Sequence, residues 1–135
     1  VPSDAWVVAV AGGLITRSKY GQGVPDLDGD GHDQTGWSVL YMHIDTNGRV
    51  PVGKMVKAGE RIGHPSCEGG VSTGTHVHLA RRYNGEWIAA DGSLPFNLDG
   101  WISSGNGIEY DGWLSKDGQA IEAWNGRQAE NQIHR

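Results

Sequence analysis

The apolar residues of this chain occur in short runs rich in β-branched and aromatic side chains, the pattern of β-strands. Residues 6–15 form one run that Gly12 and Gly13 interrupt, which predicts two strands around a turn or one strand with a bulge. In residues 37–44 both alternating faces are largely apolar, so we expect a central strand that is covered on each side. His43 then lies at the C-terminal end of this strand.

Gly-containing turns separate the later runs. Residues 50–63 predict short strands joined by a turn at 57–60. Residues 76–83 predict another strand, and the dipeptide Asn84-Gly85, a strong hairpin signal, predicts a return strand after it. Hairpin-like fragments follow at 108–110 and 119–124, and no helical pattern of ten or more residues occurs anywhere. The predicted fold class is therefore all-β, an antiparallel sheet or sandwich with Gly-rich turns and little helix.

Composition supports this fold class and excludes several functions. Of the 135 residues, 22 are Gly, roughly twice the usual share. The net charge of −5 with 11 Lys and Arg argues against a nucleic-acid surface. No run approaches the ~18 apolar residues of a membrane helix, so we expect no membrane span. Cys67 is the single cysteine, so no internal disulfide framework exists.

Histidines carry the clearest chemical signal. His76 and His78 are two residues apart on a predicted strand, which places both on one face, about 6.5–7 Å apart at Cα. Neutral imidazole binds Zn²⁺, and a catalytic zinc site keeps one position open for water. His43 offers a third imidazole at the end of another predicted strand. Residues 72–75 are small and would let a substrate approach. His32 and His64 are weaker candidates for metal ligands.

Four ordered segments resemble the LytM/lysostaphin-type zinc metallopeptidases. Residues 72–79, Ser-Thr-Gly-Thr-His-Val-His-Leu, are similar to that family's S-T-G-x-H-x-H-hydrophobic signature, and 41–44, Tyr-Met-His-Ile, resemble its Tyr-x-His-hydrophobic strand. Residues 56–63 match V-x-x-G-x-x-I-G, and 8–15 resemble the entry strands. The resemblance implies a β fold of the duplicated hybrid motif type.

The resemblance also implies roles for individual residues. His78 would bind Zn²⁺, while His76 and His43 would be catalytic, activating water and stabilising the oxyanion. We expect a substrate groove lined by three further side chains: Tyr41, Thr73 and Thr75. The implied substrate is the peptide part of bacterial cell-wall peptidoglycan, and the implied location is the cell envelope or the extracellular space of a bacterium. We expect a monomer with no nucleic-acid partner.

The chain departs from the family at the remaining metal ligands. The family supplies a His and an Asp in an H-x-x-x-D arrangement upstream of the entry strands, and only Asp4 is acidic before Val8 here. Two hypotheses follow: a metallo-endopeptidase whose first ligands lie in sequence not included here, or a non-catalytic peptidoglycan-binding or regulatory domain of the same fold. We expect the metallopeptidase-like domain at 1–100, a hairpin extension at 101–124 and a polar tail at 125–135.

Asp26, Asp28 and Asp30 alternate and precede Gly31, which is the spacing of the first half of an EF-hand calcium loop. Position 12 of such a loop would be Trp37 instead of Glu, and no flanking helices are predicted. Asp-Gly dipeptides also form turns without any ion. Two interpretations stay open: a hairpin tip that binds Ca²⁺ weakly, or a solvated turn. A calcium-dependent carbohydrate-binding domain built on this loop is a third functional hypothesis.

Overall fold

The structure, a computed structural model, describes residues 3–32, 34–72, 74–124 and 132–133. These residues form strands, bridges and turns with no helix, which confirms the predicted all-β fold class. The chain divides into two compact units, Val1–Trp87 and Ile88–Arg135, so residues 88–100 group with the second unit and not with the expected domain 1–100. Most of the expected polar tail, 125–135, lies outside the described residues.

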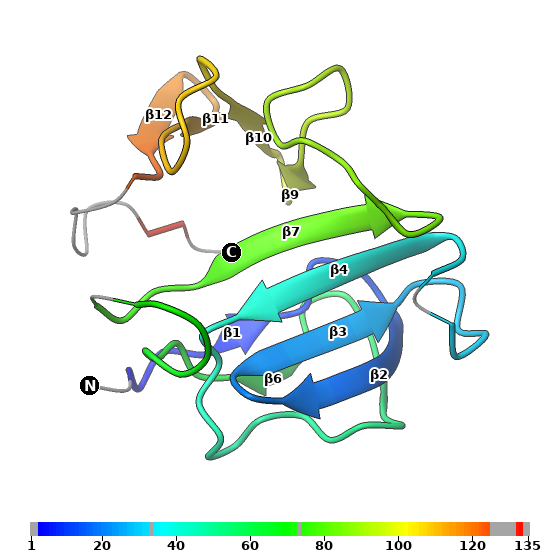
Figure 1. The fold of residues 1–135 in the computed structure, drawn as a ribbon. Coiled ribbons are helices and arrows are strands. Elements are labelled where there is room, and N and C mark those ends of the chain that lie inside the picture. Colours follow the sequence, from blue (N-terminus) through cyan, green and yellow to red (C-terminus); the bar gives the residue numbers. More distant parts are fainter. Residues whose placement is uncertain (1–2, 33, 73, 125–131, 134–135) are drawn as a thin grey trace. The chain divides into compact units, whose positions relative to one another are not determined.

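The first unit is built on one six-stranded sheet of order β5-β2-β3-β4-β7-β8, whose strands all pair antiparallel. Figure 1 shows β2, β3, β4 and β7 side by side in this order. A separate two-stranded ladder pairs β1 with β6. The strands of this unit are β1 (Val7–Val8), β2 (Gly13–Lys19), β3 (Gln22–Asp26), β4 (Trp37–Met42), β5 (Met55–Val56), β6 (Arg61–Gly63), β7 (His78–Tyr83) and β8 (Glu86–Trp87).

β4 occupies the interior of this sheet, as its two apolar faces predict. Val39 and Tyr41 are buried on one face of the strand, and Ser38 is buried on the other. The core around them draws on the sheet and on the loops between its strands; its buried members are Ala9, Ile15, Val39, Tyr41, Ile44, Val50, Val56 and Ile62. The packed core therefore holds the end of β4 in a fixed position.

Two predicted turns are confirmed. Asn84 and Gly85 both have positive φ, 50° and 80°, and they connect β7 to β8 as the hairpin signal predicts. In the turn at 57–60 the Glu60 amide donates to the Lys57 carbonyl, and Gly59 has a φ of 82°. The interrupted run 6–15 forms two strands, β1 and β2, with Gly13 opening the second.

The second unit contains a four-stranded antiparallel sheet of order β12-β11-β10-β9. Trp101 opens β10 and is buried together with Phe96. Residues 108–110 form no strand, whereas 119–122 pair with the preceding strand as a hairpin. The strands of this unit are β9 (Asn97–Leu98), β10 (Trp101–Ser104), β11 (Trp113–Lys116) and β12 (Gln119–Glu122).

Tyr41, expected in a substrate groove, belongs to the core. Its side chain is only 1% exposed, and its hydroxyl accepts a hydrogen bond of 2.8 Å from the Val10 amide. Burial raises the pKa of Tyr41 to about 12. The groove prediction is wrong for this residue because the alternation of β4 directs the Tyr41 side chain inward with that of Val39.

Tyr41→Phe is expected to lower the free energy of unfolding by about 1–3 kcal/mol, because it leaves the Val10 amide without its acceptor. Urea denaturation measures the change. Tyr83→Phe is the matched control, since Tyr83 lies on the neighbouring strand and is 45% exposed. Its effect is expected to stay within about 0.5 kcal/mol. Equal effects of the two variants would contradict a specific role of the Tyr41 hydroxyl.

Candidate metal-hydrolase site

The ends of two neighbouring strands bring the histidines together. β4 ends at Met42, which pairs with His78, the first residue of β7, so His43 emerges beside His78. The ring centroids of His43 and His76 are 4.2 Å apart, and those of His43 and His78 are 6.4 Å apart. The expected convergence of the three imidazoles is therefore present in the structure.

The backbone differs from the predicted one at two of these histidines. His76 does not share a strand with His78, because β7 begins at His78 and His76 forms an isolated bridge with Ser66. His43 lies beyond the end of β4 and has a φ of 65°. Only 3% of its surface is exposed. This left-handed conformation ends the alternation of β4, so His43 contacts His76 while Tyr41 stays in the core.

Backbone carbonyls orient two of the rings. His43 Nδ1 lies 2.9 Å from the Glu68 carbonyl oxygen, and His76 Nδ1 lies 2.8 Å from the Gly74 carbonyl oxygen. A carbonyl oxygen only accepts, so each Nδ1 donates its proton. In the neutral ring the lone pair is then on Nε2, which can accept a proton or bind a metal ion.

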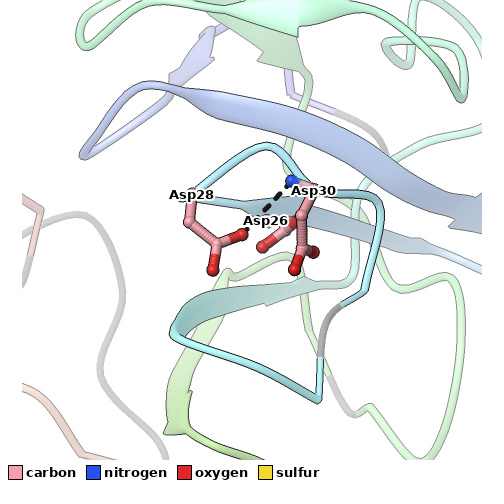
Figure 2. Close-up of side chains that lie close together, drawn as sticks. All are labelled: Asp26, Asp28 and Asp30. Atoms are coloured by element: carbon pink, nitrogen blue, oxygen red, sulfur yellow. Dashed lines mark hydrogen bonds between the residues drawn. The ribbon is translucent and has the colours of Figure 1, made fainter.

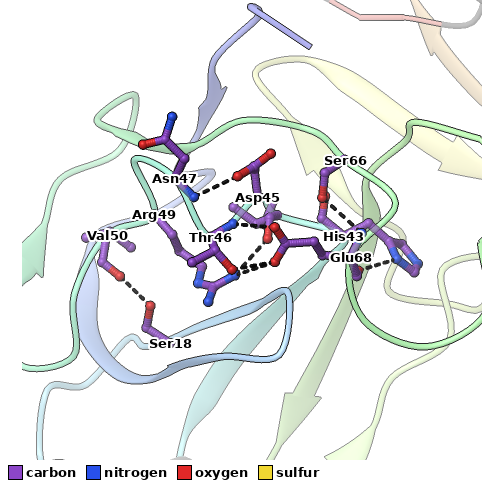
Figure 3. Close-up of polar contacts among 10 residues, drawn as sticks. Ser18, His43, Asp45, Thr46, Asn47, Arg49, Val50, Ser66 and Glu68 are labelled. Carbon is purple, nitrogen blue, oxygen red and sulfur yellow. Dashed lines mark hydrogen bonds and ion pairs between the residues drawn. The ribbon is translucent and has the colours of Figure 1, made fainter. Parts of the chain in front are cut away.

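The segment 66–68 holds His43 at its main chain as well as at its ring. The Ser66 amide and hydroxyl both donate to the His43 carbonyl, at 2.7 and 3.0 Å, and the Ser66 hydroxyl accepts from the Glu68 amide at 3.0 Å. The Glu68 carboxylate accepts from the amide and hydroxyl of Thr46 and pairs with Arg49 at 3.5 Å. Figure 3 shows this network, which fixes the carbonyl that orients His43.

Glu68→Gln is expected to destabilise the protein above pH 5, and its difference from the wild type is expected to shrink as the pH falls further below the usual pKa of a glutamate. The pKa of Glu68 lies below its usual value of 4.5, mainly because the Thr46 hydroxyl donates to the carboxylate. The Thr46 amide and the charge of Arg49 lower it further. A carboxylate with a depressed folded-state pKa stabilises the fold above the unfolded-state pKa, and this contribution is lost as pH falls through the folded-state value. Urea denaturation from pH 3 to 7 measures it. Glu86→Gln, on an exposed hairpin strand, controls for loss of a charge; a pH-independent difference would contradict the prediction.

His78 is exposed at the start of β7. Desolvation by the surrounding protein, followed by the charges of His43 and His76, lowers the pKa of His78 below its usual value. A lower pKa keeps the imidazole neutral at physiological pH, which is the form that binds metal ions. His78 therefore has both the access and the protonation state of a ligand.

The three histidines do not form a complete zinc site. Within the described parts of the chain, the one group of three or more His, Cys, Asp or Glu side chains that converges closely enough for an ion is Asp26, Asp28 and Asp30. Catalytic zinc needs about three protein ligands. His64 adds none, because its Nδ1 bonds to the Ala5 carbonyl and its ring packs on Trp6. The described residues thus fit one zinc ligand, His78, with two further imidazoles beside it.

Of the three residues that the sequence predicts to line a substrate groove, Thr75 alone is both described and exposed. Thr75 is exposed, with its hydroxyl 3.9 Å from the Cys67 sulfur, whereas Thr73 lies outside the described residues. The sequence motifs do not identify Ser66 and Glu68 as partners of His43. The one local signal was the pair Gly69-Gly70, which marks a tight loop but not its contacts.

The predicted acidic loop also forms a cluster, at the other end of β4. Asp26, Asp28 and Asp30 lie together in the connection between β3 and β4 (Figure 2). Burial is the main cause that raises the pKa of Asp26, with Asp28 and Asp30 adding to it. The His32 amide is the main cause that lowers the pKa of Asp30.

Comparisons with known proteins agree with the geometry. The sequence profile described as Peptidase family M23 matches residues 1–90. "Protease LasA" of Pseudomonas aeruginosa is 35% identical over 66 residues, or 44% of this chain. "Beta-lytic metalloendopeptidase" of Achromobacter lyticus is 31% identical over 96 residues, or 62% of this chain.

A solved structure shares the fold. It is described as "A Novel M23 Metalloprotease Pseudoalterin from Deep-sea", and it matches with a TM-score of 0.66 at 26% identity over 90% of this chain and 71% of that one. The matched segments are 16% of LasA and 25% of the beta-lytic enzyme. This chain thus corresponds to a part of the length of those curated relatives.

Proposed function

Because this chain belongs to peptidase family M23, we propose that it forms part of a zinc metallo-endopeptidase site that cleaves peptides of bacterial cell-wall peptidoglycan. The observation that supports the proposal is the convergence of His43, His76 and His78, with backbone carbonyls that leave Nε2 of the first two rings free. His76 and His78 are exposed, which suits hydrolysis at the surface of a large polymer.

The three imidazoles have distinct roles in this proposal. His78 contributes one zinc ligand, and the remaining ligands come from outside the described residues. Bound zinc would act as a Lewis acid that polarises the scissile carbonyl and lowers the pKa of water. His43 and His76 act through Nε2, each able to accept a proton in the neutral state and to donate a hydrogen bond to a developing oxyanion when protonated. The Glu68 and Gly74 carbonyls keep both rings in the tautomer that this task needs.

The substrate class follows from the family resemblance and from the open site. The exposed segment around Thr75 and His76 leaves room for a peptide to approach the rings. The curated relatives are named as proteases, and we extend that chemistry to the peptide portion of the cell wall. We therefore propose that the working protein acts in the bacterial envelope or outside the cell, and that it acts as a monomer. No helix among the described residues is long and apolar enough to cross a membrane.

The proposal is tested on the full-length protein. Elemental analysis is expected to find about one zinc per chain, and incubation with purified peptidoglycan is expected to release new amino groups. Removal of the metal with a chelator should stop the release, and added Zn²⁺ should restore it. A protein that contains no zinc, releases no amino groups and still sediments with peptidoglycan would contradict the enzyme. That result would establish the non-catalytic binding domain instead.

A further inference from the structure

The loop between β3 and β4 gathers three carboxylates at the end of the sheet opposite to the histidines. Asp26 is the last residue of β3, and Asp28 and Asp30 follow in the loop. One oxygen of each lies within 4.8 Å of the others, and Figure 2 shows the three side chains directed toward one another. β4 separates this cluster from His43 by about 17 Å of strand. The cluster is therefore independent of the proposed peptidase site.

Asp26 carries an oxygen that lacks a partner in the structure. The residue is 0% exposed, and its Oδ2 accepts a hydrogen bond of 2.9 Å from the Gly31 amide. Its Oδ1 is buried and has no hydrogen-bond partner. A buried carboxylate oxygen without a donor destabilises the fold, and two more carboxylates beside it add repulsion. A bound cation would compensate both.

The other two carboxylates are held in place by the loop itself. Asp30 accepts from the His32 amide at 2.7 Å and from the Thr35 hydroxyl at 2.9 Å, and Asp28 accepts from the Asp30 amide at 3.3 Å. Each carboxylate oxygen keeps a further lone pair after one such bond. These contacts orient the oxygens without using up their capacity to bind a metal ion.

We propose that Asp26, Asp28 and Asp30 bind one Ca²⁺ ion that stabilises the β3–β4 loop. Ca²⁺ takes six to eight oxygen ligands in flexible geometry, and three carboxylates leave positions for water, whereas Mg²⁺ demands a closer, near-octahedral arrangement. Gly31, with a φ of 86°, makes the sharp turn after the third Asp. Trp37 stands where an EF-hand loop has its bidentate Glu, so we expect weak binding, with a Kd of about 10⁻⁴–10⁻³ M.

The experiment compares the full-length wild type with Asp28→Asn, chosen because Asp28 is exposed and can change without disturbing the core. Isothermal titration with CaCl₂ into EGTA-treated, dialysed wild type is expected to show one weak site. Saturating CaCl₂ is expected to raise the melting temperature of the unit that contains β3 and β4 by about 5 °C. The variant should weaken both effects, because the Asn amide oxygen still offers a ligand but carries no charge. Without Ca²⁺ it should melt at the same temperature as the wild type or higher, because it removes a repelling charge.

Asp4→Asn is the charge-matched control, since Asp4 is exposed in the same unit, and it should keep the full response to Ca²⁺. A wild type that gives neither heat nor a thermal shift with Ca²⁺ would overturn the proposal. So would an undiminished Ca²⁺ response in Asp28→Asn, or an equal shift produced by NaCl at the same ionic strength. Because the site is remote from the histidines, its failure leaves the peptidase proposal unaffected, and the zinc measurement tests that separately.

Discussion

Replacement of His78 by alanine is expected to lower peptidoglycan hydrolysis by the full-length protein at least about 10³-fold, a loss of about 4 kcal/mol of transition-state stabilisation. His78 is exposed, its lowered pKa keeps it neutral, and it stands beside both His43 and His76. If it is one of about three zinc ligands, its removal takes away both the metal and the chemistry. Zinc content and kcat/KM for amino-group release, measured on the same samples, check the prediction.

His32→Ala is the matched control for His78→Ala. His32 is also an exposed histidine, but it lies in the β3–β4 loop, at the far end of the sheet. This variant should retain zinc and activity close to those of the wild type. His78→Ala is expected to stay folded, because an exposed imidazole contributes little to the core. Full zinc content and undiminished hydrolysis in His78→Ala would exclude the assigned metal role.

Much of the fold could be predicted from local patterns. β4 is central because both of its faces are apolar, and the hairpin between β7 and β8 follows from Asn84-Gly85. These features depend on a few neighbouring residues, so the periodicity and the turn residues of the sequence are enough to predict them. The division at Trp87 and Ile88 could not be predicted in this way, because it depends on which strands pair over a distance.

The candidate site was predictable in its residues but not in its geometry. The spacing of His76 and His78 indicates a common strand face, yet β7 begins only at His78, because His76 pairs with Ser66. The alternation of β4 places Tyr41 and His43 on one face, yet a positive φ at His43 separates the two. The left-handed backbone conformation of His43 is stabilised by tertiary contacts with the 66–68 segment. Strand periodicity in the sequence does not contain this information.

The Glu68 carbonyl connects the candidate site to the turn between β2 and β3. The Glu68 carbonyl orients His43, and the turn at Tyr20-Gly21 packs against it. A Cβ atom at Gly21 would lie 2.5 Å from the Glu68 oxygen, closer than real Cβ contacts. The Gly21 carbonyl in turn accepts from the Ile44 amide, next to His43. The absence of a side chain at Gly21 therefore lets this turn lie against the carbonyl that orients His43 and also bind the main chain that follows His43.

Gly21→Ala is expected to destabilise the fold by about 3–5 kcal/mol and to lower kcat about 10²-fold in the variant protein that remains folded. The φ of 73° costs an alanine about 1–2 kcal/mol, and the overlap with the Glu68 carbonyl adds the rest by displacing the acceptor of His43. Gly53→Ala separates the two causes, because Gly53 has a φ of 87° and no atom lies within 4 Å of the position that its Cβ would take. This control should lose only the conformational part and keep full activity. Urea denaturation and hydrolysis assays at a temperature where both variants are folded measure the difference. Equal losses in the two variants would mean that backbone strain alone explains Gly21, and that the Glu68 carbonyl does not position His43.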